Sequence, residues 1–138
     1  MTPRPIAQIL DSNVTWFVSR LLITFMFWWE GLGFLIHFGP SIPILNILGW
    51  QPAWLIPALT VLVLLAGSVL VLIDRYLWLG AGMLGVFTFL TIVLVHRFWA
   101  MTGQEAYQNR LESEEHLAVI GGLIAISMIS HFRRRPPA

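Results

Sequence analysis

The sequence is 138 residues long, with 57% hydrophobic residues and only 11% charged residues. Together with a mean hydropathy of +0.77, this composition lies outside the range of soluble globular domains and predicts an integral membrane protein. The chain has no cysteine, which excludes disulfides, thiolate metal sites and thiol–disulfide exchange within the chain itself. The net charge of +1 and its distribution give no sign of nucleic-acid binding.

The first apolar segment, residues 14–38, follows a short polar lead and contains two charges, Arg20 and Glu30. As a helix of ~37 Å it is long enough to cross a hydrocarbon core of ~30 Å. The long side chain of Arg20 can reach the interface, whereas Glu30 lies too deep for its short side chain to do so. We therefore expect Glu30 to face other helices, to be paired, or to be protonated, and the first helix to line the interior of the bundle.

Three further apolar segments follow, at about residues 53–73, 77–98 and 114–132. The proline- and glycine-containing connection before the second segment is too apolar for a solvated loop, so we expect it to lie in the membrane interface. Asp74 and Arg75 separate the second and third segments and predict a tight turn. The polar connection before the fourth segment ends at Ser113, which is a candidate N-cap for the last helix.

These segments predict an all-α fold, a four-transmembrane-helix bundle that forms one integral membrane domain over residues 1–138. Four spans put both termini on the same side of the membrane. That side has most of the arginines, namely Arg4, Arg75, Arg133, Arg134 and Arg135 with Arg20 nearby, whereas the other side has Arg97 and Arg110. By the positive-inside rule we expect both termini in the cytoplasm.

Glu30 and three histidines form the candidate ligand-binding or proton-relay group. Glu30 and His37 are seven residues apart, almost two helical turns, and share one face of the first helix. His96 ends the third span and His116 begins the fourth, so a compact bundle brings all four side chains toward one side. Imidazoles and a carboxylate can relay protons or bind a ligand. Histidines are also well accommodated at span ends, and this spacing matches no known metal-ligand pattern, so we predict no metal site.

Two other groups of residues allow a structural or a functional interpretation. Arg20 and Asp74 lie toward the same side of the membrane and predict a structural ion pair between the first span and the second turn. With Arg75 they can also form a site for an anion or a lipid headgroup. The aromatic residues at 25–29 and 98–99 can line a quinone pocket, although aromatic side chains in membrane spans more often contact lipid or neighbouring helices.

Several features match a family pattern over essentially the whole chain. The first span has an arginine, a leucine-rich run, a phenylalanine and a glycine in order, as Arg20, Leu21, Leu22, Phe27 and Gly31. The later spans add Gly67, His96, Phe98, Trp99, Ala118, Gly121 and Gly122. In these features the chain resembles the DoxX family of small four-helix bacterial membrane proteins. The family pattern has a lysine where this sequence has Phe34, and Glu30 is an added charge.

The resemblance implies a multi-pass protein of the bacterial cytoplasmic (inner) membrane that is associated with redox chemistry. Members of the family are linked to quinone-coupled sulfur oxidation as one subunit among several, and others to membrane complexes that gather soluble detoxifying enzymes. We therefore expect a subunit that anchors or serves a cofactor-bearing protein partner, with quinone as its candidate ligand. The sequence has no cysteine, nucleotide-binding loop or strong metal motif with which to carry out redox chemistry alone.

Two alternatives remain open on the sequence alone. The first is a small transporter or lipid-ligand-binding membrane protein in which protonation of Glu30 is coupled to binding. The second is a self-contained membrane enzyme that uses His96 or His116 as an acid–base group. The catalytic residues, the substrate and the partner are not defined by the sequence, and an oligomer is compatible with it.

Overall fold

The computed structural model describes residues 2–134, and all regular structure in this part of the chain is helical. The elements are α1 (Arg4–Asp11), α2 (Asn13–Ile36), α3 (Phe38–Leu45), α4 (Leu55–Leu72), α5 (Leu77–Leu94), the 3-10 turn η1 (Phe98–Ala100) and α6 (Gly103–Arg133). Four segments, namely α2, α4, α5 with the residues up to Ala100, and α6, are long and apolar enough to cross a membrane. The predicted all-α bundle of four membrane-spanning helices is therefore confirmed, while the cytoplasmic location of the termini stays a prediction.

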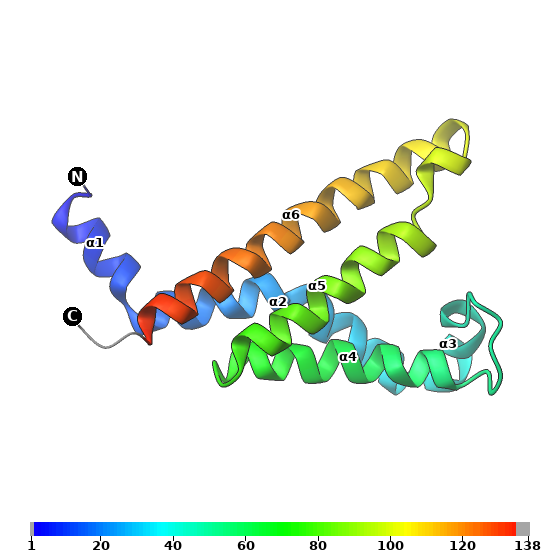
Figure 1. Ribbon diagram of the computed structural model, residues 1–138, viewed down its shortest axis with the longest axis horizontal. Helices are drawn as coiled ribbons and strands as arrows, with labels where there is room; N and C mark the ends of the chain where they lie inside the picture. Colours follow the sequence, from blue (N-terminus) through cyan, green and yellow to red (C-terminus); the bar gives the residue numbers. More distant parts are fainter. Residues whose placement is uncertain (1, 135–138) are drawn as a thin grey trace.

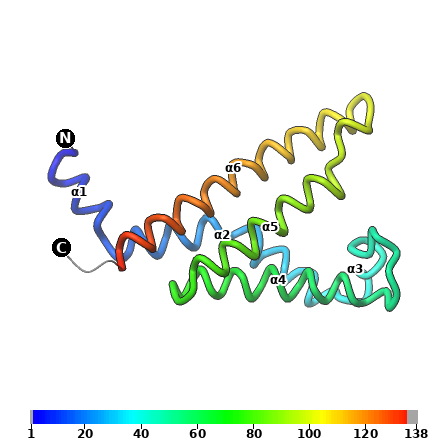
Figure 2. The backbone as a smooth tube through the Cα atoms, in the orientation of Figure 1, coloured from blue at the N-terminus to red at the C-terminus, as the bar shows by residue number. Residues whose placement is uncertain are grey.

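The four long helices pack in chain order, with α2 against α4, α4 against α5, and α5 against α6. Figure 1 shows that α5 and α6 lean away from α2 and α4 toward one end of the molecule. We call this the distal end, which holds α3 and η1. The opposite, terminal end holds α1, the turn between α4 and α5, and the last turn of α6, as the tube in Figure 2 also shows. The helices are therefore in closest contact near the terminal end.

Small residues allow close packing of the helices at two places. A Cβ atom added to Gly80 of α5 would lie 2.6 Å from the carbonyl oxygen of Gly67 in α4, so no larger residue fits without moving the backbone. A Cβ atom on Gly122 of α6 would lie 2.5 Å from Cδ1 of Ile23 in α2. These contacts bring the helix backbones together around a core that includes Phe27, Leu64, Val71, Leu77, Leu84 and Leu123.

The polar lead before the first span is a short helix, α1, which the sequence did not lead us to expect. Its apolar residues Ile6, Ile9 and Leu10 follow the helical i, i+3, i+4 spacing and are all exposed. A helix with one exposed apolar face suits the surface of a bilayer, where that face can enter the headgroup region. Ser12 then begins α2, because its Oγ accepts a hydrogen bond from the amide of Val14 at 3.1 Å.

The last helix starts at Gly103 and not near Ser113, so the polar connection expected before the fourth span is itself helical. Charged side chains are compatible with a helix in water, just as apolar side chains are compatible with a helix in lipid. The polar residues of this stretch are therefore consistent with a part of α6 outside the bilayer and do not mark the start of the helix. Arg110 and Glu114, four residues apart, form an ion pair of 2.8 Å on its exposed surface. With 31 residues, α6 is ~46 Å long and exceeds the ~30 Å hydrocarbon core.

Candidate functional site

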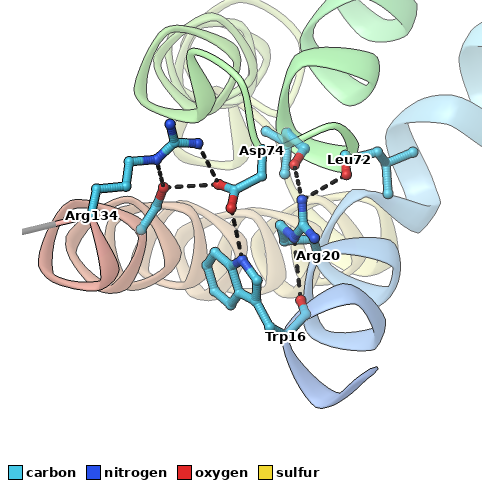
Figure 3. A network of polar contacts seen from close by, with 7 residues as sticks. Trp16, Arg20, Leu72, Asp74 and Arg134 are labelled. Carbon is cyan, nitrogen blue, oxygen red and sulfur yellow. Dashed lines mark hydrogen bonds and ion pairs between the residues drawn. The ribbon is translucent and has the colours of Figure 1, made fainter. Parts of the chain in front are cut away.

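A polar network at the terminal end is centred on the carboxylate of Asp74 (Figure 3). Asp74 Oδ2 accepts a hydrogen bond from Trp16 Nε1 at 3.0 Å. Its other oxygen, Oδ1, accepts one from Ser130 Oγ at 2.9 Å and lies 3.3 Å from Nη2 of Arg134. The network therefore joins α2, the α4–α5 turn and α6 through one side chain.

Arg20 belongs to the same network but bonds to the backbone. Its side chain is buried, Nη1 donates to the carbonyl oxygens of Leu72 at 2.6 Å and Val71 at 3.2 Å, and Nε donates to Trp16 O at 3.3 Å. The two α4 carbonyls belong to the last turn of that helix, where carbonyl groups lack intrahelical partners and a cation is favourable. Arg20 and Asp74 are thus brought to one place, with the guanidinium on the end of α4 and the carboxylate paired with Arg134.

A second cluster at the distal end joins α5 to α6. His96 Nδ1 lies 2.9 Å from Glu112 Oε2 and 3.0 Å from Asn109 Oδ1. The His96 and His116 rings meet edge to face with their centroids 5.0 Å apart. Nδ1 of His116 is buried and has no hydrogen-bond partner among the described residues. Within residues 2–134 no three acidic, histidine or cysteine side chains are placed to hold a metal ion. Imidazole and carboxylate groups in contact, as in this cluster, are able to exchange protons.

The structure does not bring Glu30 and His37 to this histidine cluster. Glu30 is exposed on α2 and His37 is exposed at its C-cap, and Figure 1 shows α2 and α6 well separated at the distal end. The imidazole of His37 makes a local polar contact, from Nδ1 to Gly33 O at 3.2 Å. Of the four candidate residues, only His96 and His116 lie together.

The position of Glu30 differs from the expectation that it would face the other helices. The buried face of α2 consists of Trp16, Arg20, Thr24, Phe27 and Gly31. Glu30 directly precedes Gly31 and is therefore turned by ~100° from that face. Gly31 packs against Leu64 and Leu65, at the middle of the candidate membrane span α4, which places Glu30 at the level of the middle of that span. The exposed carboxylate of Glu30 therefore lies at a depth where lipid surrounds it unless another molecule covers it.

Beside Glu30, three aromatic rings gather on the outward side of α2. Phe25 stacks on Trp29 with 5.9 Å between centroids and meets Trp28 edge to face at 5.0 Å. Phe25 and Trp29 are exposed. The indole nitrogen of Trp28 is buried without a hydrogen-bond partner in the described part of the chain. This cluster offers flat apolar surface and one unused hydrogen-bond donor.

Comparison with known families identifies the fold. The DoxX family model matches residues 15–97, which include α3, α4, α5 and nearly all of α2. The chain belongs to the DoxX family. The DoxX segment contains Glu30, Arg20, Asp74 and His96, whereas the α6 partners of Asp74 and His96 lie outside it. No curated protein and no solved structure matches the chain.

Several members of these clusters were not predicted from the sequence. Trp16, Ser130 and Arg134 complete the terminal network, and Asn109 and Glu112 complete the distal one. The only sequence signal for them is spacing by four, which puts Trp16 and Arg20 on one face of α2, and Ser130 and Arg134 on one face of α6. That spacing identifies shared faces but not the helix toward which each face turns.

Proposed function

We propose that this chain is a membrane subunit of a bacterial redox system that anchors or serves a cofactor-bearing protein partner. The observation that carries the proposal is the exposed side chain of Glu30, which lies in the last two turns of α2 at the level of the middle of α4. An ionisable group at the centre of a helix costs about 2.5–3.5 kcal/mol to place in a membrane. A partner that covers Glu30 and supplies a hydrogen-bond donor or a cation removes this cost.

The surface around Glu30 is suited to a second helix. Gly33 and His37 lie three and seven residues after Glu30, on the same stripe of α2. A Cβ atom added to Gly33 would have no atom within 4 Å, so a partner helix could approach the α2 backbone closely at this point. We define Glu30, Gly33 and His37 as the Glu30 stripe, and infer that it is the partner-binding surface.

The redox assignment rests on the DoxX family and on the composition of the chain. Because the sequence contains no cysteine, redox centres held by thiolates would have to come from the partner. In this proposal the chain lies in the bacterial inner membrane with both termini in the cytoplasm, where most of its arginines would lie.

The test uses a photo-reactive amino acid placed at position 30 in native membranes, followed by mass spectrometry of the cross-linked products. Val86 is the matched control position, because it is exposed near the middle of α5, away from the Glu30 stripe. A near-equimolar partner bearing flavin, metal or reactive cysteines, captured from position 30 but not from 86, supports the proposal. Equal capture from both positions, or lipid alone from both, contradicts it.

A second candidate function, binding of a lipid-soluble ligand such as a quinone, is favoured by the buried and unpartnered Trp28 Nε1 beside two exposed rings. A quinone carbonyl could accept from this nitrogen while its ring stacks on the aromatic cluster. In this case Trp28→Phe should weaken binding of a ubiquinone analogue to the purified protein, whereas Trp54→Phe, at an exposed residue directly before α4, should not. Equal affinities of both variants and the parent would exclude the cluster as a quinone site.

Glu30→Gln separates the two candidates further. If Glu30 couples ligand uptake to protonation, the glutamine variant loses uptake or binding of the ligand while remaining inserted in the membrane. If Glu30 meets a partner, the same variant loses the partner and leaves ligand binding unchanged.

A further inference from the structure

A cavity of about 440 Å³ opens at the terminal end, between the α4–α5 turn and the last turns of α6. It lies next to the Asp74 network shown in Figure 3. Its polar and aromatic lining comes from Arg75, Tyr76, Trp78, Ser127, Ser130, His131 and Arg134. Its lining includes two arginines and no acidic residue.

The charges around this cavity are not balanced. Asp74, the neighbouring acid, is already engaged by Trp16, Ser130 and Arg134. Arg75 forms no ion pair with an acid in the described part of the chain, and its guanidinium lies over the Tyr76 ring at 5.6 Å from the centroid. One arginine charge at the cavity wall is therefore available to an anion.

The turn that presents Arg75 is held in an uncommon backbone conformation. Asp74 and Tyr76, on either side of it, both have φ of +57°, in the left-handed region that residues other than glycine seldom adopt. The hydrogen bonds and ion pair of Asp74 hold its side chain to two other helices. The backbone of the turn, held by the contacts of Asp74, therefore fixes the position of Arg75 at the cavity wall.

The level of the cavity in the membrane indicates what could enter it. Tyr76 and Trp78 are exposed at the first residues of α5, and such amphipathic rings are typical of the headgroup level of a bilayer. Guanidinium groups match phosphate oxygens in charge and geometry and can bind them through two parallel hydrogen bonds.

We propose that this cavity binds a phosphate group, with Arg75 as the cationic partner and the Tyr76 hydroxyl as a hydrogen-bond donor. Arg134, whose charge is paired with Asp74, lines the same cavity and can add a hydrogen bond from its guanidinium. Two sources share this chemistry, the phosphodiester of an anionic phospholipid and a free or small-molecule phosphate. The site is at the terminal end, separate from the Glu30 stripe in the last two turns and the C-cap of α2, so the proposal is independent of the proposed function.

The test measures binding of phosphatidylglycerol to the purified full-length protein in detergent by native mass spectrometry. Arg75→Gln should raise the dissociation constant about tenfold, the effect of losing one charged hydrogen-bonded contact. Arg4→Gln is the matched control, since Arg4 is an exposed arginine of α1 at the same end of the molecule. It should change the constant less than twofold, whereas equal weakening by both variants, or by neither, would overturn the proposal.

Two further arms identify the source of the phosphate and confirm the location. Inorganic phosphate is added to the lipid-bound protein at about millimolar concentration. Displacement of the lipid would indicate that the natural ligand is a soluble phosphate. Retention of the lipid would indicate that the ligand is the lipid headgroup. Ser127→Phe fills the cavity from α6 without changing charge and should abolish lipid binding in the same assay. Binding that survives Ser127→Phe in a folded protein would place the lipid elsewhere and overturn the assignment.

Discussion

The indole nitrogen of Trp16 donates a hydrogen bond of 3.0 Å to Oδ2 of Asp74, 58 positions away in the sequence. The bond connects α2 to the α4–α5 turn, and Asp74 also accepts from Ser130 of α6 and pairs with Arg134. One carboxylate therefore links three parts of the bundle at the end where the helices are packed most closely.

Replacing Asp74 with alanine should lower the free energy of unfolding by about 3 kcal/mol, because the variant loses two hydrogen bonds and an ion pair and leaves the partners unsatisfied. The free energy of unfolding can be measured by denaturant titration of the purified protein in mixed micelles. Asp11→Ala, at an exposed residue of α1, is the control and should change it by less than about 0.5 kcal/mol. Equal effects of the two substitutions would mean that the Asp74 network contributes nothing to stability.

Arg20→Lys should destabilise the protein by about 1–3 kcal/mol, although the charge is retained. The guanidinium donates through two nitrogens to Trp16 O, Val71 O and Leu72 O, and a lysine ammonium cannot reproduce that planar geometry. The same titration measures the change. Arg110→Lys, on the exposed surface of α6, is the matched control. An equally small change in the free energy of unfolding for Arg20→Lys and Arg110→Lys would contradict the hydrogen bonds observed for Arg20.

Gly80→Ala should destabilise the bundle by about 1–3 kcal/mol, since the added methyl group would lie 2.6 Å from the Gly67 carbonyl oxygen. Gly85→Ala, on the same helix, meets no atom within 4 Å and should be neutral or stabilising by up to about 1 kcal/mol. Thermal unfolding of the two variants in the same detergent provides the comparison. A lower midpoint for Gly85→Ala than for Gly80→Ala would show that α4 and α5 do not approach closely at Gly67.

Glu30→Gln should leave the unfolding free energy of the isolated protein within about 0.5 kcal/mol of the parent, because Glu30 is exposed and no contact with another described side chain is lost. Denaturant titration in mixed micelles measures this, with Asp74→Ala as the positive control. A loss of 2 kcal/mol or more, on the order expected for a buried charged hydrogen bond, would show that Glu30 has a structural role within the chain.

The number of membrane-crossing helices could be predicted because each needs about 20 apolar residues, and hydropathy counts such segments directly. The ends of the helices could not be predicted in the same way, because a helix can continue in water after it leaves the lipid. Residues before Ser113 are polar but remain helical from Gly103, and the lead before Asn13 contains α1. In both places the change in polarity was interpreted as a change in secondary structure.

The partners of the site residues were less predictable for a related reason. In a membrane helix almost every face is apolar, so the sequence pattern does not define which face is buried. Arg20 and Asp74 could be assigned to one end by counting residues along the spans, whereas contacts such as Trp16 to Asp74 depend on how each helix is rotated. The exposure of Glu30 is the clearest case, since depth alone predicted that it would face inward.

The length of α6 has a mechanical consequence. This helix runs without interruption from Gly103, in its polar part beyond the bilayer, to Arg133 at the terminal end. Because an unbroken helix bends little over such a length, a tilt imposed on its polar end displaces Ser127 and Ser130 on the other side of the membrane. Because Ser127 and Ser130 line the cavity and Ser130 also bonds to Asp74, an event at one membrane surface can alter both the cavity and the Asp74 network at the other.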